Sequence, residues 1–397
     1  MSSLPYTPPI HKIKVGLLGC TGVVGQQFIR LLHNHPWFEL SVLGASERSA
    51  GQKYTDACTW KLPSDIPQSI IHKPVVTCEP NNFTVCSAVF SALDSSVAGD
   101  IELSFAQSGY SVFSNARNWR YDNTIPILVP YANSSHIHSI TEQQNRFQFK
   151  QKSGYIITNA NCSSTGLVVA LKPLLDKYGI QSVHVVTMQA LSGAGMLTYY
   201  TLLYICVSEY ILTYYHLLYL RIGYPGVSSL DIMDNIYPYI SGEEEKMEME
   251  PQKILGKLDT TQHNTFVSAE FNVSAMCNRV PVIDGHTECV SIKLNKSYNS
   301  IDDIIQCLQS YTSECQLLQL PSAATTPLYV HTNNIRPQPR LDRDHSNGMC
   351  VTVGRIRKCN LYDIKFNLVS HNTVIGAAGG SILNAELAYA KGYIIQK

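Results

Sequence analysis

The sequence predicts an α/β protein: an N-terminal Rossmann-type, doubly wound parallel sheet followed by an α+β catalytic and dimerisation domain. Strand-length apolar runs alternate with helical stretches through the first 160 residues, which is typical of a parallel sheet. A glycine-rich turn separates the first of these strands from the first helix, as in dinucleotide-binding folds. The length of 397 residues also favours two domains over one.

The composition argues against several classes of partner. The formal net charge is zero and charged residues make up 15% of the chain, so nothing points to nucleic acid or to an anionic membrane surface. The 12 cysteines are scattered without a CxxC pair, and the first residues lack the apolar core of a signal peptide. We therefore expect a cytoplasmic protein with reduced thiols, no metal site, no nucleic-acid partner and no membrane partner.

The glycine-rich turn is Gly19-Cys-Thr-Gly22-Val-Val-Gly25, between a strand predicted over Lys12–Leu18 and a helix over Gln26–His33. Glycines here permit a tight turn and let a pyrophosphate approach the helix N-terminus. The alternative is a tight turn without a ligand. The residues expected to bind the dinucleotide are Gly19, Thr21, Gly22, Val23, Val24 and Gly25.

The next strand, Phe38–Leu43, ends in a polar loop that indicates which dinucleotide is bound. An NAD site would place an acidic residue at this strand end, whereas Ser46, Arg48 and Ser49 suit a 2′-phosphate. The sequence therefore favours NADP, with Glu47 facing solvent. An ordinary polar loop is the alternative.

Three further apolar runs are predicted to extend the sheet: Val85–Ala92, Ser111–Ala116 and Ile125–Val129. Arg120 lies between two of them and could hold an anion. A solvated loop charge is an equally good interpretation of this arginine.

Cys162 follows an extended run, Tyr155–Thr158, and precedes a helical stretch, Leu167–Asp176. The backbone N–H groups and dipole of a helix N-terminus favour a thiolate, which is the nucleophilic form. Asn161 and its polar neighbours could donate to an oxyanion. Cys162 is thus a candidate nucleophile, with a buried structural cysteine as the alternative.

The second domain is predicted from runs at Val183–Leu191, Phe266–Ala275 and Glu288–Leu294, which suggest longer antiparallel strands. Arg279 and His286 lie between the last two runs, as a possible carboxylate clamp and a possible general acid/base. A structural histidine is the alternative. We expect an NADP-binding domain over 1–160, a catalytic domain over 161–362, and a segment over 363–397 that returns to the first domain.

Five motifs in order carry a resemblance to a known family: Gly19-Cys-Thr-Gly-Val-Val-Gly25, Ala45-Ser-Glu-Arg-Ser-Ala-Gly51, Asn161-Cys162-Ser163, Gln189-Ala-Leu-Ser-Gly-Ala-Gly195 and Arg279-Val-Pro-Val-Ile-Asp-Gly-His286. With them the chain resembles aspartate-semialdehyde dehydrogenase, in the form found in fungi and archaea. The resemblance runs from about Lys12 to the C-terminus, except for Met196–Ile222.

The resemblance implies an NADP-dependent enzyme that reversibly converts aspartyl 4-phosphate to aspartate 4-semialdehyde and phosphate through a cysteine thioester, in threonine and methionine biosynthesis. It also implies a homodimer or homotetramer. The implied roles are Cys162 as nucleophile, His286 as acid/base, Gln189 as the residue that orients the substrate, Arg279 as carboxylate grip, Glu243 as partner of the substrate amine, Lys246 and Arg120 as the phosphate site with Asn161 beside them, and Ser192 and Gly193 beside the cofactor.

Two other functions stay open at this point. An N-acetyl-glutamyl-phosphate reductase would share the fold and the cysteine chemistry, but an acetylated amine needs no acidic partner, so the cluster Glu243–Glu245 favours the aspartyl substrate. Which of the three glutamates meets the amine is not decided by the motif. The second alternative is an inactive or membrane-tethered protein.

The stretch Met196–Ile222 prompts that last alternative, because it is almost wholly apolar and holds seven of the 23 tyrosines. It is long enough to span a bilayer, but Glu209 near its middle is costly there. We predict instead that the stretch is a retained intron, whose removal joins the glycine at 195 or 223 directly to Tyr224.

Overall fold

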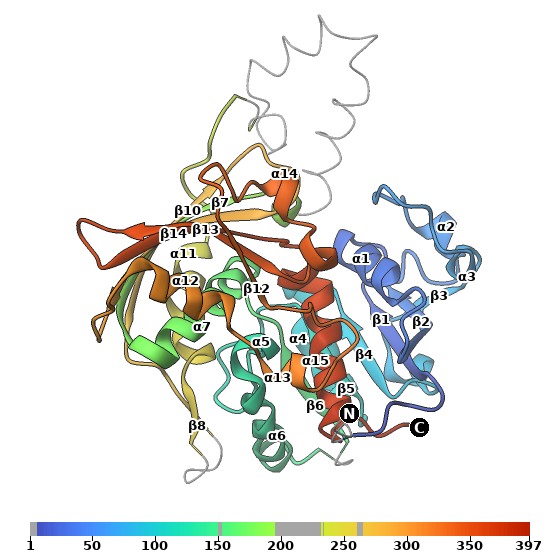
Figure 1. Cartoon of the computed structure of the whole chain (residues 1–397). Helices are drawn as coiled ribbons and strands as arrows, with labels where there is room; N and C mark the ends of the chain where they lie inside the picture. The colour runs from blue at the N-terminus through green and yellow to red at the C-terminus, as the bar shows by residue number, and fades with distance from the viewer. Residues whose placement is uncertain (1–5, 150–152, 195–231, 233, 260–264) are drawn as a thin grey trace, which may run out of the picture.

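The computed structural model describes residues 6–149, 153–194, 232, 234–259 and 265–397. These residues form two six-stranded sheets and one two-stranded sheet. Figure 1 shows the two large sheets as separate layers, with the blue and cyan strands of the first sheet on one side of the molecule. The predicted stretch Met196–Ile222 lies outside the described residues.

The first sheet has the order β3-β2-β1-β4-β5-β6, and every neighbouring pair is parallel. Its central strands are almost completely buried, as expected for a parallel sheet with helices on both faces. This arrangement confirms the predicted Rossmann-type fold. The strands are β1 (Ile13–Leu18), β2 (Phe38–Ala45), β3 (Val75–Thr77), β4 (Ala88–Ser91), β5 (Ser111–Ser114) and β6 (Tyr155–Thr158).

The helical segments of this part are short apart from α1 and α4. They are α1 (Val23–Leu32), α2 (Tyr54–Ala57), α3 (Gln68–Ile71), η1 (Pro80–Phe83), α4 (Ser95–Gln107), α5 (Pro130–Asn133), η2 (Ser134–Ser139) and α6 (Ile140–Phe147).

One predicted strand of the first sheet is wrong. The run Ile125–Val129 touches β6 only through an isolated bridge between Ile127 and Thr158. Pro126 lies inside the run and has no N–H, so it cannot extend a ladder of hydrogen bonds.

The second sheet has the order β10-β7-β11-β14-β13-β12. Pairs β10–β7 and β12–β13 are parallel and the others antiparallel, so the sheet is mixed rather than antiparallel as expected. Its strands are β7 (Ile180–Gln189), β10 (Asn272–Arg279), β11 (His286–Leu294), β12 (Leu328–His331), β13 (Val351–Lys358) and β14 (Ile364–Ser370).

The predicted strand Phe266–Ala275 is divided into two. Its beginning belongs to β9 (Thr265–Val267), which pairs with β8 (Lys257–Asp259), and its end belongs to β10. Between them the Ala269 N–H donates to the Gln252 carbonyl, so the chain turns to follow a helix instead of extending a strand.

The remaining helices cover one face of the second sheet or connect it to the first. Helices α7 and α11 pack on the face that carries the buried side chains of β7, β10 and β11. The helical segments are α7 (Cys162–Tyr178), η3 (Leu191–Ala194), α11 (Glu243–Ile254), α12 (Ile301–Gln309), α13 (Glu314–Leu317), α14 (Pro339–Asp342), η4 (His345–Gly348), η5 (Val374–Ala378) and α15 (Gly379–Ala390).

The C-terminal helix α15 contacts β5 and α5 of the first part. Figure 1 shows it in red beside the first sheet, with the two ends of the chain close together. A continuous apolar core cluster includes residues of both large sheets and of α7 and α15. Within the described ranges, no helix is both long enough and apolar enough to cross a membrane.

Candidate active site

Cys162 is the first residue of α7, directly after the N-cap Asn161. The Asn161 side chain accepts from the N–H groups of Ser163 (3.0 Å) and Ser164 (3.4 Å), which satisfies backbone donors that a helix start leaves free. The cap therefore fixes the start of the helix at the cysteine. The predicted helix began five residues later, because the polar residues around Cys162 gave no apolar periodicity.

The Cys162 sulfur lies 3.1 Å from Nε2 of His286, which is fully buried at the start of β11. The Ala190 N–H donates to the other ring nitrogen, Nδ1, at 3.0 Å. The neutral imidazole therefore carries its proton on Nε2, facing the sulfur. Burial and the nearby Arg279 lower the pKa of His286 to about 3.

The surroundings of Cys162 favour the thiol over the thiolate. Burial raises its pKa to about 12, and the negative charge of Glu243 adds to the rise. Arg279, Arg120 and Lys246 oppose it. Desolvation thus raises the pKa of Cys162, whereas the nearby cations and the N-terminus of a helix favour the thiolate.

Three of the predicted residues come from one end of the second sheet. Arg279 of β10 pairs with Gln189 of β7. Thr287 pairs with Met188, so His286 lies beside Gln189 in the next position. The Arg279 guanidinium donates to the Ala190 carbonyl at 2.7 Å. A single sheet edge thus places the arginine, the glutamine and the histidine together.

Glu243 is the glutamate of the acidic cluster that faces this edge. Its Oε2 accepts from Asn161 Nδ2 (2.9 Å) and Gln189 Nε2 (3.2 Å), and its Oε1 lies 2.6 Å from Lys246 Nζ. Burial would raise the pKa of Glu243, but Lys246 and the hydrogen bonds outweigh it and hold the pKa below its usual value. Glu244 instead accepts from the Cys277 N–H, and Glu245 is exposed.

Arg120 reaches the same place from the first domain. Its guanidinium donates to Glu250 Oε1 at 2.9 Å and to the Asn115 carbonyl at 3.0 Å. The other oxygen of Glu250 accepts from the Asn161 N–H at 2.6 Å. Glu250 was not predicted as a site residue from the sequence. The one pattern that could have indicated it is its spacing of seven residues from Glu243, which places both on the same face of α11.

A cavity of about 480 Å³ joins most of these residues. It lies at the carboxyl ends of β1, β4 and β5, where the order of the parallel sheet reverses and such folds bind nucleotides. Predicted site residues that line it are Gly22, Val23, Val24, Arg120, Asn161, Cys162, Ser192, Gly193, Glu243 and Lys246.

The glycine turn fits a ligand that approaches the backbone closely. Gly19 has φ +78°, and a Cβ there would lie 2.7 Å from the Ala92 carbonyl oxygen. A Cβ on Gly25 would lie 2.3 Å from the Gly19 oxygen, so only glycine permits this turn. Thr21 is half-buried within it. The β1–turn–α1 geometry is therefore suited to a dinucleotide pyrophosphate.

The three residues predicted to bind a 2′-phosphate do not line this cavity. They follow the carboxyl end of β2, next to β1 in the sheet, with Ser46 and Arg48 exposed and Ser49 buried. Glu47 is exposed as expected.

The C-terminal segment supplies cavity residues that the sequence did not assign. The residues from this segment that line the cavity are Asn372, Thr373, Gly376 and Ala377. The Asn372 side chain also donates from Nδ2 to Ser192 Oγ at 2.8 Å. A Cβ on Gly376 would lie 3.0 Å from the Cys162 Cβ. The Gly/Ala-rich composition of this stretch was the only available signal for so close an approach.

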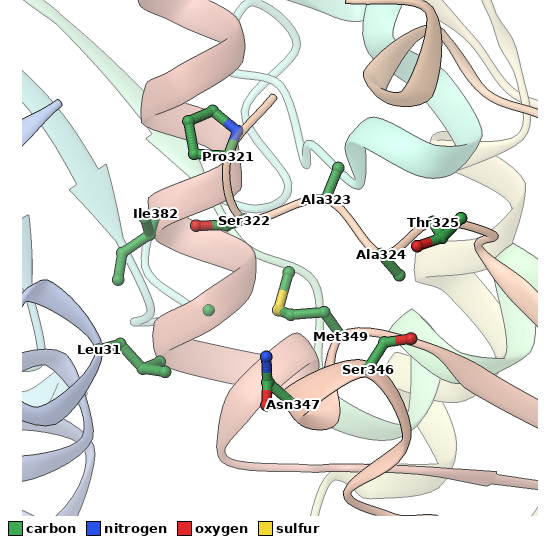
Figure 2. Close-up of a pocket in the computed structure, with 11 residues that line it drawn as sticks. Leu31, Pro321, Ser322, Ala323, Ala324, Thr325, Ser346, Asn347, Met349 and Ile382 are labelled. Atoms are coloured by element: carbon green, nitrogen blue, oxygen red, sulfur yellow. The ribbon is translucent and has the colours of Figure 1, made fainter. Parts of the chain in front are cut away.

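A second cavity, of about 340 Å³, lies between α15, α1 and the segment before β12 (Figure 2). Figure 2 shows Met349, Ile382 and Leu31 among small residues such as Ala324 and Ser322. None of its lining residues is ionisable, whereas the first cavity is lined by Cys162, Glu243 and Lys246; His286 does not line that cavity but contacts the Cys162 sulfur from the side of β11.

Family models and full-length relatives match this chain. The model "Semialdehyde dehydrogenase, NAD binding domain" matches residues 14–140, and "Semialdehyde dehydrogenase, dimerisation domain" matches residues 171–375. The aspartate-semialdehyde dehydrogenase of Cryptococcus neoformans is 48% identical over 97% of this chain and 99% of its own length. That of Candida albicans is 46% identical over 96% and 99%.

A solved structure shows the same fold. The crystal structure of aspartate-semialdehyde dehydrogenase with NADP from Candida albicans has a TM-score of 0.82 and 44% identity, covering 97% of this chain and 100% of that one. The crystal structure of aspartate-semialdehyde dehydrogenase II complexed with ASA from Vibrio cholerae has a TM-score of 0.71 and 25% identity, covering 96% of this chain and 99% of that one. The chain belongs to the aspartate-semialdehyde dehydrogenase family.

Proposed function

We propose that this protein catalyses the reversible, NADP-dependent conversion of aspartyl 4-phosphate to aspartate 4-semialdehyde and phosphate, through a thioester on Cys162. The observation that carries the proposal is the 3.1 Å contact between the Cys162 sulfur and His286 Nε2, beside a cavity that also contains Arg120 and Lys246. A nucleophile, a proton carrier and two anion-binding groups are what a phosphorylating aldehyde dehydrogenase needs.

In the oxidative direction the Cys162 sulfur adds to the aldehyde carbon and forms a thiohemiacetal. His286 Nε2 passes its proton to the aldehyde oxygen and takes up the proton of the thiol, so the proton moves from sulfur to oxygen through one nitrogen. NADP, when bound, supplies the hydride acceptor for oxidation and the hydride donor for the reverse reaction. Loss of the hydride and release of the hydroxyl proton to solvent turn the thiohemiacetal into a thioester. Phosphate held by Arg120 and Lys246 would then attack the acyl carbon, so that the C–S bond breaks and Cys162 leaves as a thiolate.

The substrate would be held at both of its ends. Arg279 offers a guanidinium to the carboxylate, Glu243 accepts from the amino group, and Gln189 orients the reacting end. An ionised Glu243 supports an amine-bearing substrate over an N-acetylated one, because the acetylated nitrogen carries no charge. A coupled assay with aspartate semialdehyde and N-acetyl-glutamate semialdehyde separates the two activities.

NADP is the proposed cofactor, with the glycine turn under its pyrophosphate and Ser46, Arg48 and Ser49 at its 2′-phosphate. The relative from Candida albicans solved with NADP supports this choice. Ser192 and Gly193 would lie beside the reacting end. The proposed setting is threonine and methionine biosynthesis in the cytoplasm, and the domain limits 1–160, 161–362 and 363–397 stay predictions.

The proposed assembly is a homodimer or homotetramer. The face of the second sheet that α7 and α11 do not cover is half-exposed along β7 and β11. One row of paired residues crosses four strands on that face: Met276 of β10, Val186 of β7, Cys289 of β11 and Asn367 of β14. A sheet face that the described residues leave half-exposed is suited to packing against a second copy.

The central test is Cys162→Ala, assayed for NADPH formation from aspartate semialdehyde, phosphate and NADP. We expect turnover to be abolished, because the covalent route is lost, while NADP affinity measured by calorimetry stays nearly unchanged. Substantial residual turnover in the alanine variant would overturn the assignment of Cys162.

A further inference from the structure

We propose that Glu250 is a positioning residue for the phosphate step, which holds Arg120 in register with the turn that presents Cys162. The inference rests on the proposed function, because it assigns Glu250 to one half of that reaction. Glu250 is completely buried on α11 and does not line the cavity, so it acts through its neighbours.

The two oxygens of the Glu250 carboxylate bind groups from different parts of the site. Oε1 accepts from the Arg120 guanidinium at 2.9 Å, and Oε2 accepts from the Asn161 N–H at 2.6 Å. Arg120 and Glu250 lie 130 positions apart in the sequence, and Asn161 immediately precedes Cys162. One rigid carboxylate therefore sets the distance between the anion-binding guanidinium and the backbone of the nucleophile.

The pairing leaves Arg120 able to bind an anion. Its second terminal nitrogen donates to the Asn115 carbonyl at 3.0 Å, which fixes the plane of the guanidinium. The buried Nε has no partner among the described residues. Arg120 also lines the cavity together with Lys246 and Cys162. Glu250 and Asn115 thus fix the guanidinium, and we expect the N–H groups of its terminal nitrogens that they do not use to bind an incoming phosphate.

Lys253, about one helical turn after Glu250 on the same face of α11, binds the loop that contains Arg120. The Lys253 ammonium donates to the carbonyls of Arg120 (2.7 Å), Asp122 (2.6 Å) and Ile125 (2.9 Å). Glu243, Lys246, Glu250 and Lys253 follow the spacing of one helix face. A single helix of the second domain thereby fixes the substrate amine partner, the phosphate lysine and the phosphate arginine of the first domain.

The phosphate step needs this alignment more than the first half of the reaction does. Addition of the sulfur to the aldehyde uses Cys162 and His286, which Glu250 does not touch. Attack on the thioester requires the phosphate oxygen to arrive beside the acyl carbon, and a small misplacement of one of its two cationic partners lowers the rate sharply.

The test is E250Q, with E248Q as the matched control. Glutamine keeps an oxygen for the Asn161 N–H but turns an amide NH2 toward Arg120, so it removes the charge pairing selectively. Glu248 lies on the same helix and accepts from the Ala275 N–H, a bond that glutamine preserves, away from Arg120. Steady-state kinetics with phosphate varied, and the burst of NADPH formed without phosphate, report the two halves of the reaction separately.

We expect E250Q to raise KM for phosphate or lower kcat with phosphate by at least roughly tenfold, with the burst rate and KM for the semialdehyde within twofold of the wild type. E248Q should behave as wild type. In the cycle E250Q, R120K and the double variant, the losses should be strongly non-additive, because both changes remove one interaction. If E250Q folds poorly, E250D, which keeps the charge but stretches one bond, should show the same selective loss.

An equal loss in both halves of the reaction would show that Glu250 is merely structural, and E250Q kinetics identical to E248Q would also overturn the proposal. Failure of the wild-type protein to form NADPH from aspartate semialdehyde and phosphate would instead overturn the proposed function.

Discussion

At the scale of single residues, the protonation state of Cys162 decides when the site becomes reactive. Burial raises the pKa of this thiol to about 12, and burial with Arg279 lowers the pKa of His286 to about 3. These shifts favour the thiol and the neutral imidazole at pH 7 in the free protein. A low thiolate fraction makes a cysteine slow to react with alkylating agents.

This pairing predicts how alkylation depends on pH. Because the thiolate is the reactive form, inactivation by iodoacetamide should accelerate about tenfold per pH unit between pH 7 and 9 without a plateau. Residual activity measures the inactivation. A plateau reached below pH 8 would show a preformed thiolate–imidazolium pair and contradict the prediction.

The sequence could indicate residues that carry their own local signal. Cys162 at a strand-to-helix turn, the glycines from Gly19 to Gly25 and the Arg279…His286 pair were all recognisable in short motifs. Glu250 and Lys253 were not, because their roles depend on α11 lying beside a loop some 130 positions earlier in the chain. A short motif also cannot predict the pKa of Cys162, because that pKa depends on how far the folded protein buries the thiol.

At the scale of secondary structure elements, the predictions succeeded where periodicity and glycine agreed. The β1–turn–α1 unit has both signals and matches the expectation. The run Phe266–Ala275 was apolar enough to suggest one strand, but it crosses from β9 to β10 through a turn that α11 fixes by the Gln252 carbonyl. Such a tertiary contact overrides strand propensity and has no signature in a single sequence.

The end of β2 gives a prediction about cofactor choice. Ser46 and Arg48 follow the end of β2 and are exposed, which suits a 2′-phosphate; Glu47 between them is exposed as well and is expected to face solvent. We expect kcat/KM to favour NADP over NAD by at least about tenfold, and Arg48→Ala to remove most of the preference, since a charge-assisted hydrogen bond contributes about 1.5–3 kcal/mol. Glu39→Ala, elsewhere on β2, is the control. Equal efficiency of both cofactors in the wild type would contradict this.

At the scale of the whole molecule, the open face of the second sheet predicts the assembly. Val186 lies near the middle of that face, half-exposed between Met276 and Cys289. A charge there should be desolvated on dimerisation, so Val186→Glu is expected to convert the oligomer to monomers by sedimentation velocity. Val267→Glu, on the exposed β9, should leave the assembly intact. Unchanged sedimentation of Val186→Glu would place the interface elsewhere.

The last prediction concerns which chain is the working enzyme. The codons of Gly195-Met196-Leu197 can read GGT-ATG-TTA, which contains the donor GTATGT. Ile211-Leu212-Thr213 can read ATA-CTA-ACT with the branch sequence TACTAAC, and Ile222-Gly223 can read ATA-GGT with an acceptor AG. Excision is then in frame and restores Ser-Gly-Ala-Gly-Tyr-Pro-Gly next to Ser192, which lines the catalytic cavity. The wealth of Tyr, Leu and Ile is also what AT-rich non-coding sequence yields when translated.

A mature transcript without these codons would support the retained intron, and so would the behaviour of two versions of the protein. The version in which Gly195 is joined to Tyr224 should be soluble and form NADPH from aspartate semialdehyde. The full chain of 397 residues should aggregate, because a sequence stretch this long and this apolar promotes association wherever it is exposed. Abundant cellular protein that contains a Met196–Ile222 peptide and has full activity would refute the prediction and make the stretch a genuine insertion of this enzyme.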